Sequence, residues 1–161
     1  MFPKMRRQLQ QISNDRAIEI LQKCGHAVLS IQDDITGYPY AVPISPVYCD
    51  NHIYVHSAPI GHKISALKAH PNVSLCVVDK DEIHPEKLTS YFRSVIVFGT
   101  ARFVTDPEEK RRILEKLVEK FAPDFHAEGR AEAEQKIHYI TIIDIAIDHI
   151  TGKEAIELIE R

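Results

Sequence analysis

The sequence predicts a mainly β fold, a small antiparallel barrel of six strands with flanking helices. About six extended segments follow one another mostly in hairpin order, and only one helical segment, residues 60–70, interrupts the early strands. Gly and Pro lie inside several of these segments, and bent strands in hairpin order are typical of an antiparallel barrel rather than of a doubly wound parallel sheet. At 161 residues, the chain is expected to form a single domain over 1–161 with a core of its own.

A helix and a hairpin are expected first. Residues 17–24 carry an apolar stripe at helical spacing, cap candidates precede it at 13–15, and Gly25 follows it as a stop. Residues 26–32 then alternate apolar and polar side chains, which is typical of a strand. The cluster at 33–37 predicts a turn, so the next extended run should fold back on this strand.

That run, residues 39–48, contains three prolines, which cannot donate to a sheet ladder. The strand should therefore be either an edge strand or one opened by bulges. After a turn, residues 53–57 are predicted to be a strand. Residues 60–70 show helical spacing, and Pro71 ends that helix.

The middle of the chain alternates strands with a charged stretch. Residues 72–79 are rich in Val and Leu and predict a strand, whereas residues 80–91 are charged and predict a surface loop. Residues 92–104 predict a long strand with a bend or a bulge at Gly99. Asp106 followed by Pro107 then predicts the start of an amphipathic helix.

The ends of the chain are less regular. Residues 1–11 form a polar tail, and residues 122–136 are polar and predict an irregular loop. A last strand is expected over 137–150, with a bend near Ile142 where the apolar phase changes. Residues 153–161 predict a short terminal helix.

Composition excludes several classes of protein. The chain carries 20 Lys and Arg against 23 Asp and Glu, a net charge of −3, which argues against a nucleic-acid binder. No apolar run approaches the ~20 residues needed to cross a bilayer, and the N-terminus lacks the apolar core of a secretory signal. Three cysteines cannot all pair, and none is spaced C-x-x-C. We therefore expect a cytoplasmic protein with no membrane and no nucleic-acid partner.

The segment 54–64 is where the sequence best indicates chemistry. A strand ends at Ser57, a Pro and a Gly set a turn, and a helix begins with His62 and Lys63. Free N–H groups and the positive end of the dipole at a helix start attract anions. A hydroxyl, an imidazole and an ammonium placed there could complete a phosphate cradle. The alternative is a plain turn with solvated side chains, although cations in the first turn of a helix oppose its dipole.

The chain also resembles a known superfamily over residues 12–155. The resemblance rests on the order of a helix, "GHAVLSI", "GYPYAVPISPVY", "IYVHSAPIGHKISALKAHP", "VSLCVV", "SVIVFGTARFV", a helix, "IHYI" and "DHITGKEA", of which "HSAPIGHKI" with "ALKAHP" is the specific part. It is similar to the pyridoxamine 5′-phosphate oxidase-related, FMN-binding split-barrel superfamily, in its 5-nitroimidazole-resistance (Nim-like) branch. The resemblance implies a split β-barrel, a homodimer, and FMN in the groove between the two copies.

Site residues follow from this resemblance position by position. Those implied to hold the FMN phosphate are Ser57, His62 and Lys63. Those implied to flank the ribityl chain are His56, Ala58 and Ile64. Those implied to present backbone groups to the isoalloxazine ring are Pro43, Ile44 and Ser45, and those implied to reach the pyrimidine edge from the partner subunit are Arg93 and Ser94. His149–Lys153 is a further candidate for closing the site.

Departures from the family narrow the expected activity. Val42 stands where the oxidases carry an Arg that grips the phosphate, and their substrate-binding residues near the C-terminus have no match. The expectation is therefore an FMN-dependent oxidoreductase that reduces a small nitroaromatic or quinone-like acceptor, with His56 as the catalytic residue that delivers a proton. One alternative is a flavin-binding or flavin-sequestering protein without turnover. Haem or a deazaflavin in place of FMN is another.

The remaining histidines, cysteines and acids have ordinary interpretations. His52 and His56 lie about 13 Å apart if residues 52–56 are a strand, so we expect no zinc pair and no metal site. A catalytic thiol is not expected, because two cysteines lie on apolar faces and Asp50 should raise the pKa of Cys49. Asp144 and Asp148 are expected on a solvated face.

Overall fold

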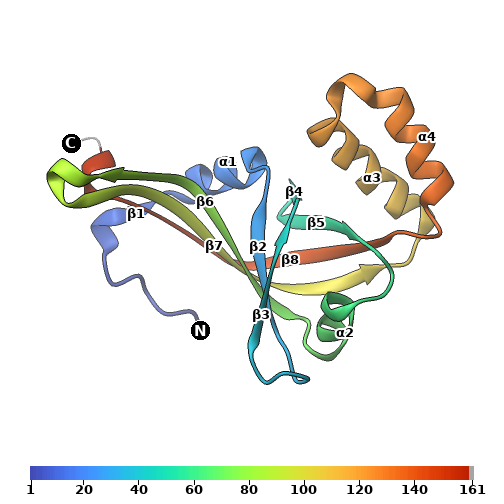
Figure 1. Cartoon of the computed structure of the whole chain (residues 1–161), viewed down its shortest axis with the longest axis horizontal. Coiled ribbons are helices and arrows are strands. Elements are labelled where there is room, and N and C mark those ends of the chain that lie inside the picture. Colours follow the sequence, from blue (N-terminus) through green and yellow to red (C-terminus); the bar gives the residue numbers. More distant parts are fainter. Residues whose placement is uncertain (160–161) are drawn as a thin grey trace.

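The fold is built on one antiparallel sheet of eight strands, more than the six expected. The structure is a computed structural model that describes residues 1–159. In space the strands run β3-β2-β6-β7-β8-β5-β4, with β1 added to β8 (Figure 1). Their bounds are β1 Gln11–Ile12, β2 Ala27–Gln32, β3 Pro39–Ile44, β4 Val47–Cys49, β5 His52–Ser57, β6 Asn72–His84, β7 Thr89–Val104 and β8 Thr141–Glu154.

The order of the strands requires the sheet to curl. The two edge strands, β3 and β4, are consecutive in the chain and are joined only by Ser45 and Pro46. A sheet whose opposite edges are tied by so short a link must bend round until the edges approach each other. The result is a barrel split between β3 and β4, in agreement with the split barrel that the resemblance implied. The run 39–48, expected as one strand, is divided at Ser45 and Pro46 into these two edge strands, where a missing N–H donor is tolerated.

Two apolar clusters hold the fold together. One fills the barrel and includes Leu29, Leu75, Val95 and Ile143, all of which are at most 1% exposed. The other lies between the barrel and the C-terminal helices and includes Ile142. The phase change near Ile142 thus reflects burial on both faces of β8, and the strand register shows no bend there.

Four α-helices flank the sheet. Their bounds are α1 Asn14–Lys23, α2 His62–Ala69, α3 Pro107–Phe121 and α4 His126–Lys136, and short 3-10 turns occupy Gln8–Gln10, Pro85–Lys87, Pro123–Phe125 and Ile156–Leu158. The predicted caps are confirmed, because the side chains of Ser13 and Asp106 accept hydrogen bonds from the backbone N–H groups of Arg16 and Glu109. The terminal helix expected from residue 153 is reduced to the last short turn, and residues 160–161 lie outside the described part.

The charged stretch 80–91 is not a loop. It continues β6 and β7 into a long hairpin, which we call the arm (residues 79–93) and which projects from the barrel at the end opposite α2 and α3 (Figure 1). A register shift between Val78 and Lys80 marks where the arm begins. The prediction failed because both faces of the arm carry charged side chains, so its strands show no apolar alternation.

Residues 122–136 are also not irregular, because most of them form α4. This helix is polar on every side and lacks the amphipathic stripe by which a helix is recognised in sequence. It is held against α3 by contacts between distant residues, including the ion pairs Arg111–Glu134 and Arg130–Glu115. The tail is likewise partly ordered, since β1 pairs with the end of β8.

The prediction that Asp144 and Asp148 lie on a solvated face of β8 is correct for only one of them. Asp148 is exposed, but the side chain of Asp144 is 1% exposed and lies against His52 Nδ1 at 2.6 Å and Arg102 Nη2 at 2.7 Å. These partners come from β5 and β7, and only the folded sheet brings them to the carboxylate.

Candidate functional site

A groove opens at the split of the barrel. It encloses about 290 Å³ and draws on four parts of the chain, the end of β3, the middle of β5, the start of α2 and the residue before β2. Its lining residues are His26, Pro43, Ile44, Ser45, Val55, His56 and Lys63. The split therefore gathers several residues that the sequence assigned to one site.

Unpaired backbone borders this groove. β4 pairs with β5 only as far as Tyr54, so Val55–Ser57 bond to β8 on one side and have no strand partner on the other. β3 pairs only with β2. Backbone donors and acceptors need partners when they leave water, so these two open edges can bind a planar polar ligand that enters the split.

The start of α2 carries a free positive charge into the groove. Gly61 precedes the helix at φ 131° and offers no side chain to cap the first N–H groups. Lys63 is half-buried, and among residues 1–159 it has no hydrogen-bond or ion-pair partner. Burial alone lowers the pKa of its ammonium group. A half-buried cation beside uncapped N–H groups fits an anionic ligand such as a phosphate.

His62 points to a different neighbour. Its Nε2 atom lies 3.0 Å from Asp33 Oδ2, and its ring stacks on Tyr40 with centroids 4.3 Å apart. At the other end of the helix, His70 Nε2 lies 2.6 Å from Asp34 Oδ2. The turn between β2 and β3 therefore holds both ends of α2, and the His62 ring is already paired with a carboxylate.

Asp33 is the anchor of this turn, and its removal should show in the pH dependence of stability. The hydroxyl of Thr36, the His62 ring and two backbone N–H groups lower the pKa of Asp33 to about 2. Because the folded pKa lies below the unfolded value of about 4, this contribution to stability is present above pH about 4 and is lost as the pH falls toward 2. We expect Asp33→Asn to unfold more easily than wild type at neutral pH in urea titrations, with the difference shrinking over that acid range. The same substitution at exposed Asp124 should have little effect on stability. If the loss of stability in Asp33→Asn stayed constant down to pH 2, Asp33 would not be the anchor of this turn.

The other residues of the predicted site have mixed positions. His56 is exposed in the groove, Ser57 is half-buried at the end of β5, and Ala58 is exposed just beyond it. The side chain of Ile64 is buried in the barrel core. Sequence reasoning overlooked His26, although the register of Ala27 opposite Ile44 places it beside the β3 end of the groove.

Arg93 and Ser94 lie away from the groove of their own chain. Both are at the base of the arm, where Arg93 Nε donates to Glu154 Oε2 at 2.8 Å and Nη1 donates to Asp79 Oδ2 at 3.1 Å. The candidate segment His149–Lys153 also lies outside the groove, and its His149 ring stacks on Phe2 with centroids 4.5 Å apart. The protomer alone therefore does not bring these residues to the site.

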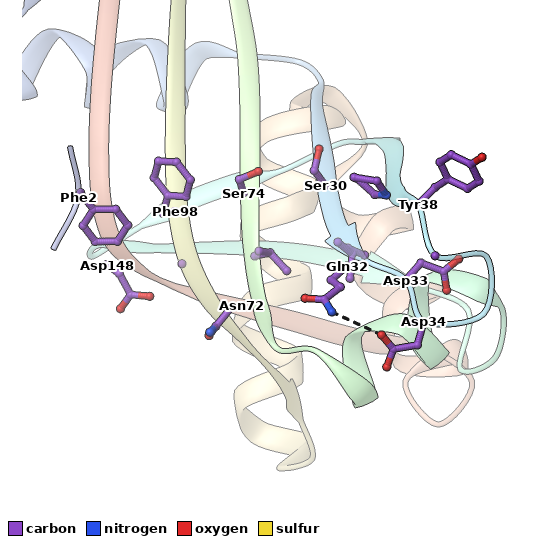
Figure 2. Close-up of a pocket in the computed structure, with 15 residues that line it drawn as sticks. Phe2, Ser30, Gln32, Asp33, Asp34, Tyr38, Asn72, Ser74, Phe98 and Asp148 are labelled. Carbon is purple, nitrogen blue, oxygen red and sulfur yellow. Dashed lines mark hydrogen bonds between the residues drawn. The ribbon is translucent and has the colours of Figure 1, made fainter. Parts of the chain in front are cut away.

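A larger hollow of about 800 Å³ lies on the outer face of the sheet (Figure 2). Ser30 and Ser74 lie on strands at its floor, and Phe2 and Phe98 stand at the side opposite Tyr38. Its carboxylates already have partners, since Asp34 binds His70 and Asp148 accepts from the Thr100 hydroxyl. With no lysine or arginine in its lining, it lacks the charge that marks the groove.

The sheet topology defines the class of protein as a split β-barrel, and the groove lies at its split. A family model described as pyridoxamine 5′-phosphate oxidase (Pyridox_ox_2) matches residues 13–154. The chain belongs to this family, in agreement with the resemblance seen in its sequence motifs.

Solved structures agree with this assignment. A candidate 5-nitroimidazole antibiotic resistance protein from Bacteroides thetaiotaomicron is 26% identical, with a TM-score of 0.74 over 89% of this chain and 86% of that one. The fold is shared by an FAD-binding protein from Mesorhizobium loti, which is 24% identical with a TM-score of 0.66 over 91% of this chain and 97% of that one. It is also shared by an FAD- and haem-binding protein from Mycobacterium smegmatis, which is 23% identical with a TM-score of 0.77 over 91% of this chain and 73% of that one. No protein of curated function matches the sequence. Within residues 1–159, the helices are all too short or too polar to span a membrane.

Proposed function

We propose that this chain is an FMN-binding oxidoreductase that works as a homodimer and reduces a small nitroaromatic or quinone-like acceptor. The observation that carries the proposal is the half-buried, unpartnered ammonium of Lys63 at the uncapped start of α2, inside the groove at the split. Family membership supports the same cofactor class.

The phosphate end of FMN fits the start of α2. Lys63 would supply a charge-assisted hydrogen bond, the first backbone N–H groups of the helix would supply others, and Ser57 would add a hydroxyl at the end of β5. His62 would contribute its backbone N–H while its ring stays with Asp33, which holds the helix start in place.

The ring end fits the open strand edges. Backbone groups of Ile44 and Ser45 on one side and of His56 and Ser57 on the other have no strand partner toward the split. When bound, FMN would supply the electron exchange, and the protein would supply placement, electrostatics and protons. His56 and Ala58 would flank the ribityl chain between these two ends. The side chain of Ile64 is buried in the barrel core and would support the start of the helix from beneath.

The second half of the site is proposed to come from a second copy. A groove of about 290 Å³ is at the small end of the range for ligand sites. The arm is two-stranded beyond Arg93 and exposes Ile83 and Leu88, although isolated two-stranded hairpins are only marginally stable in water. In a twofold dimer the arm base of each copy would bring Arg93 and Ser94 to the partner's groove, with His149–Lys153 on the adjoining strand.

The acceptor class is favoured by the relative linked to 5-nitroimidazole resistance. The direct test starts from the absorption spectrum of the purified protein, with chromatographic identification of any released flavin as FMN or FAD. We expect a yellow protein that a reductant bleaches and that regains its colour faster with a nitroimidazole or a quinone than in buffer under anaerobic conditions. Colour without acceptor-dependent recovery would identify a flavin-binding protein without turnover, a haem spectrum would identify the haem alternative, and a colourless protein that takes up no flavin would refute the proposal.

His56 is proposed to deliver the proton because its side chain is exposed in the groove and an imidazole ring can both donate and accept a proton. We expect His56→Gln to slow acceptor reduction and to change the pH profile of its kcat. FMN affinity should change much less than the rate. A pH profile that is unchanged in the variant would remove His56 from the mechanism.

A further inference from the structure

The link between the two edges of the barrel is held by a lysine from outside the barrel. Pro46 is buried and lies between β3 and β4, so its carbonyl oxygen has no strand partner. Lys120 Nζ, in the last turn of α3, donates to this oxygen at 2.8 Å. A buried carbonyl without a donor is costly, so this hydrogen bond satisfies an acceptor that the fold would otherwise leave unpaired.

Lys120 is an unusual donor for this purpose. It is half-buried, burial lowers the pKa of its ammonium group, and within residues 1–159 no carboxylate pairs with it. The neighbouring ionisable group is the Cys24 thiol at the end of α1. Burial raises the pKa of this thiol, and the charge of Lys120 lowers it. Burying a charge without a counter-ion costs free energy. This cost favours a role for Lys120 at the split in addition to its place in α3.

We infer that Lys120 is a positioning residue for the flavin ring. Its bond to Pro46 sets the path of the link, and the preceding residues Pro43–Ser45 line the groove with the backbone proposed to contact the ring. Lys120 does not line the groove, so it acts through the link. This inference rests on the proposed function, and it separates the two ends of the site, since Lys63 serves the phosphate and Lys120 serves the ring.

The chain contains a matched control on the same helix. Lys110 is also half-buried and donates to a backbone carbonyl, that of Ile140 at 3.0 Å, but this bond lies in the connection between α4 and β8, and neither residue lines the groove. Lys110→Met and Lys120→Met therefore remove equivalent bonds, one remote from the groove and one behind it.

The experiment measures the affinity of each variant for FMN and for riboflavin, at a temperature where circular dichroism shows the protein folded. Lys120→Met should weaken both flavins by a similar factor, about 5- to 50-fold, because the ring is common to both. Lys120→Arg, which keeps a charged donor, should recover most of this loss, and Lys110→Met should lower thermal stability with flavin affinity unchanged. Should Lys120→Met fail to fold, Lys120→Gln takes its place with a smaller expected loss.

The outcomes separate this inference from the proposed function. Unchanged flavin affinity in Lys120→Met, or equal losses in Lys110→Met, would overturn the positioning role while wild type still binds flavin. A loss confined to FMN would also overturn it, because that result would place Lys120 at the phosphate. If wild type binds neither FMN nor riboflavin, the proposed function itself fails.

Discussion

Replacing Lys63 with Ala is expected to weaken FMN binding by about 1.5–3 kcal/mol, the value of a charge-assisted hydrogen bond in a partly buried site. Riboflavin lacks the phosphate, so its affinity should hardly change. The reason is structural, because Lys63 is the half-buried cation of the groove and has no carboxylate partner within residues 1–159. Titration of the apoprotein with each flavin, followed by fluorescence quenching, measures both affinities.

Lys68 provides the matched control for this measurement. It lies on α2 as well but is exposed in the last turn of the helix and does not line the groove. Lys68→Ala changes the net charge by the same amount and should leave both flavins unaffected. Equal losses of FMN and riboflavin in Lys63→Ala would mean that the phosphate does not lie at the start of α2.

Replacing Gly99 with Ala is expected to lower the free energy of unfolding by about 1–3 kcal/mol, the usual cost of overfilling a packed core. The pairing of β7 with β8 shifts register between Phe98 and Gly99, which confirms that the strand is irregular at this glycine. A Cβ atom at Gly99 would lie 2.5 Å from the backbone oxygen of Ala146 and 2.7 Å from Ile145 Cγ2. Because a backbone oxygen in the central sheet cannot move freely, the strands must separate locally to admit the methyl group.

Gly25→Ala is the comparison for this substitution. No atom lies within 4 Å of the position that its Cβ would occupy, and its backbone is not in the left-handed region. This change should be neutral, or stabilising by up to about 1 kcal/mol through the unfolded chain. Urea unfolding of the two variants measures the contrast, and equal stabilities would show that the bulge at Gly99 accommodates a side chain.

Elements with a clear local signal were predictable. The cap at Ser13 and the apolar stripe after it predicted α1, and Asp106 with Pro107 predicted the start of α3. The prolines of residues 39–48 predicted either an edge strand or one opened by bulges, because the missing N–H group is a property of the residue itself. The family resemblance then supplied the split barrel, which local patterns alone left as a small antiparallel barrel.

Elements stabilised by distant partners were not predictable. The arm carries charged side chains on both faces and α4 has no apolar stripe, so their sequences show neither strand nor helix periodicity. Asp144 was expected in solvent because alternation along a strand gives no information on what covers each face. In the structure, α3 covers the outer face of β8 there, and His52 and Arg102 make the burial of the carboxylate possible.

The sequence by itself determined the fold class and the segment 54–64 as the candidate anion cradle, because turns, caps and strand alternation depend on neighbours in the chain. Only the tertiary structure decided which of the two basic side chains in that cradle is free. His62 and Lys63 are adjacent in sequence, yet the helical rotation between them turns one ring onto Asp33 and leaves the other charge in the groove. The link at Pro46 depends in the same way on Lys120, 74 residues further along the chain. Such pairings arise from the curling of the sheet, which brings its edges and the ends of its helices together.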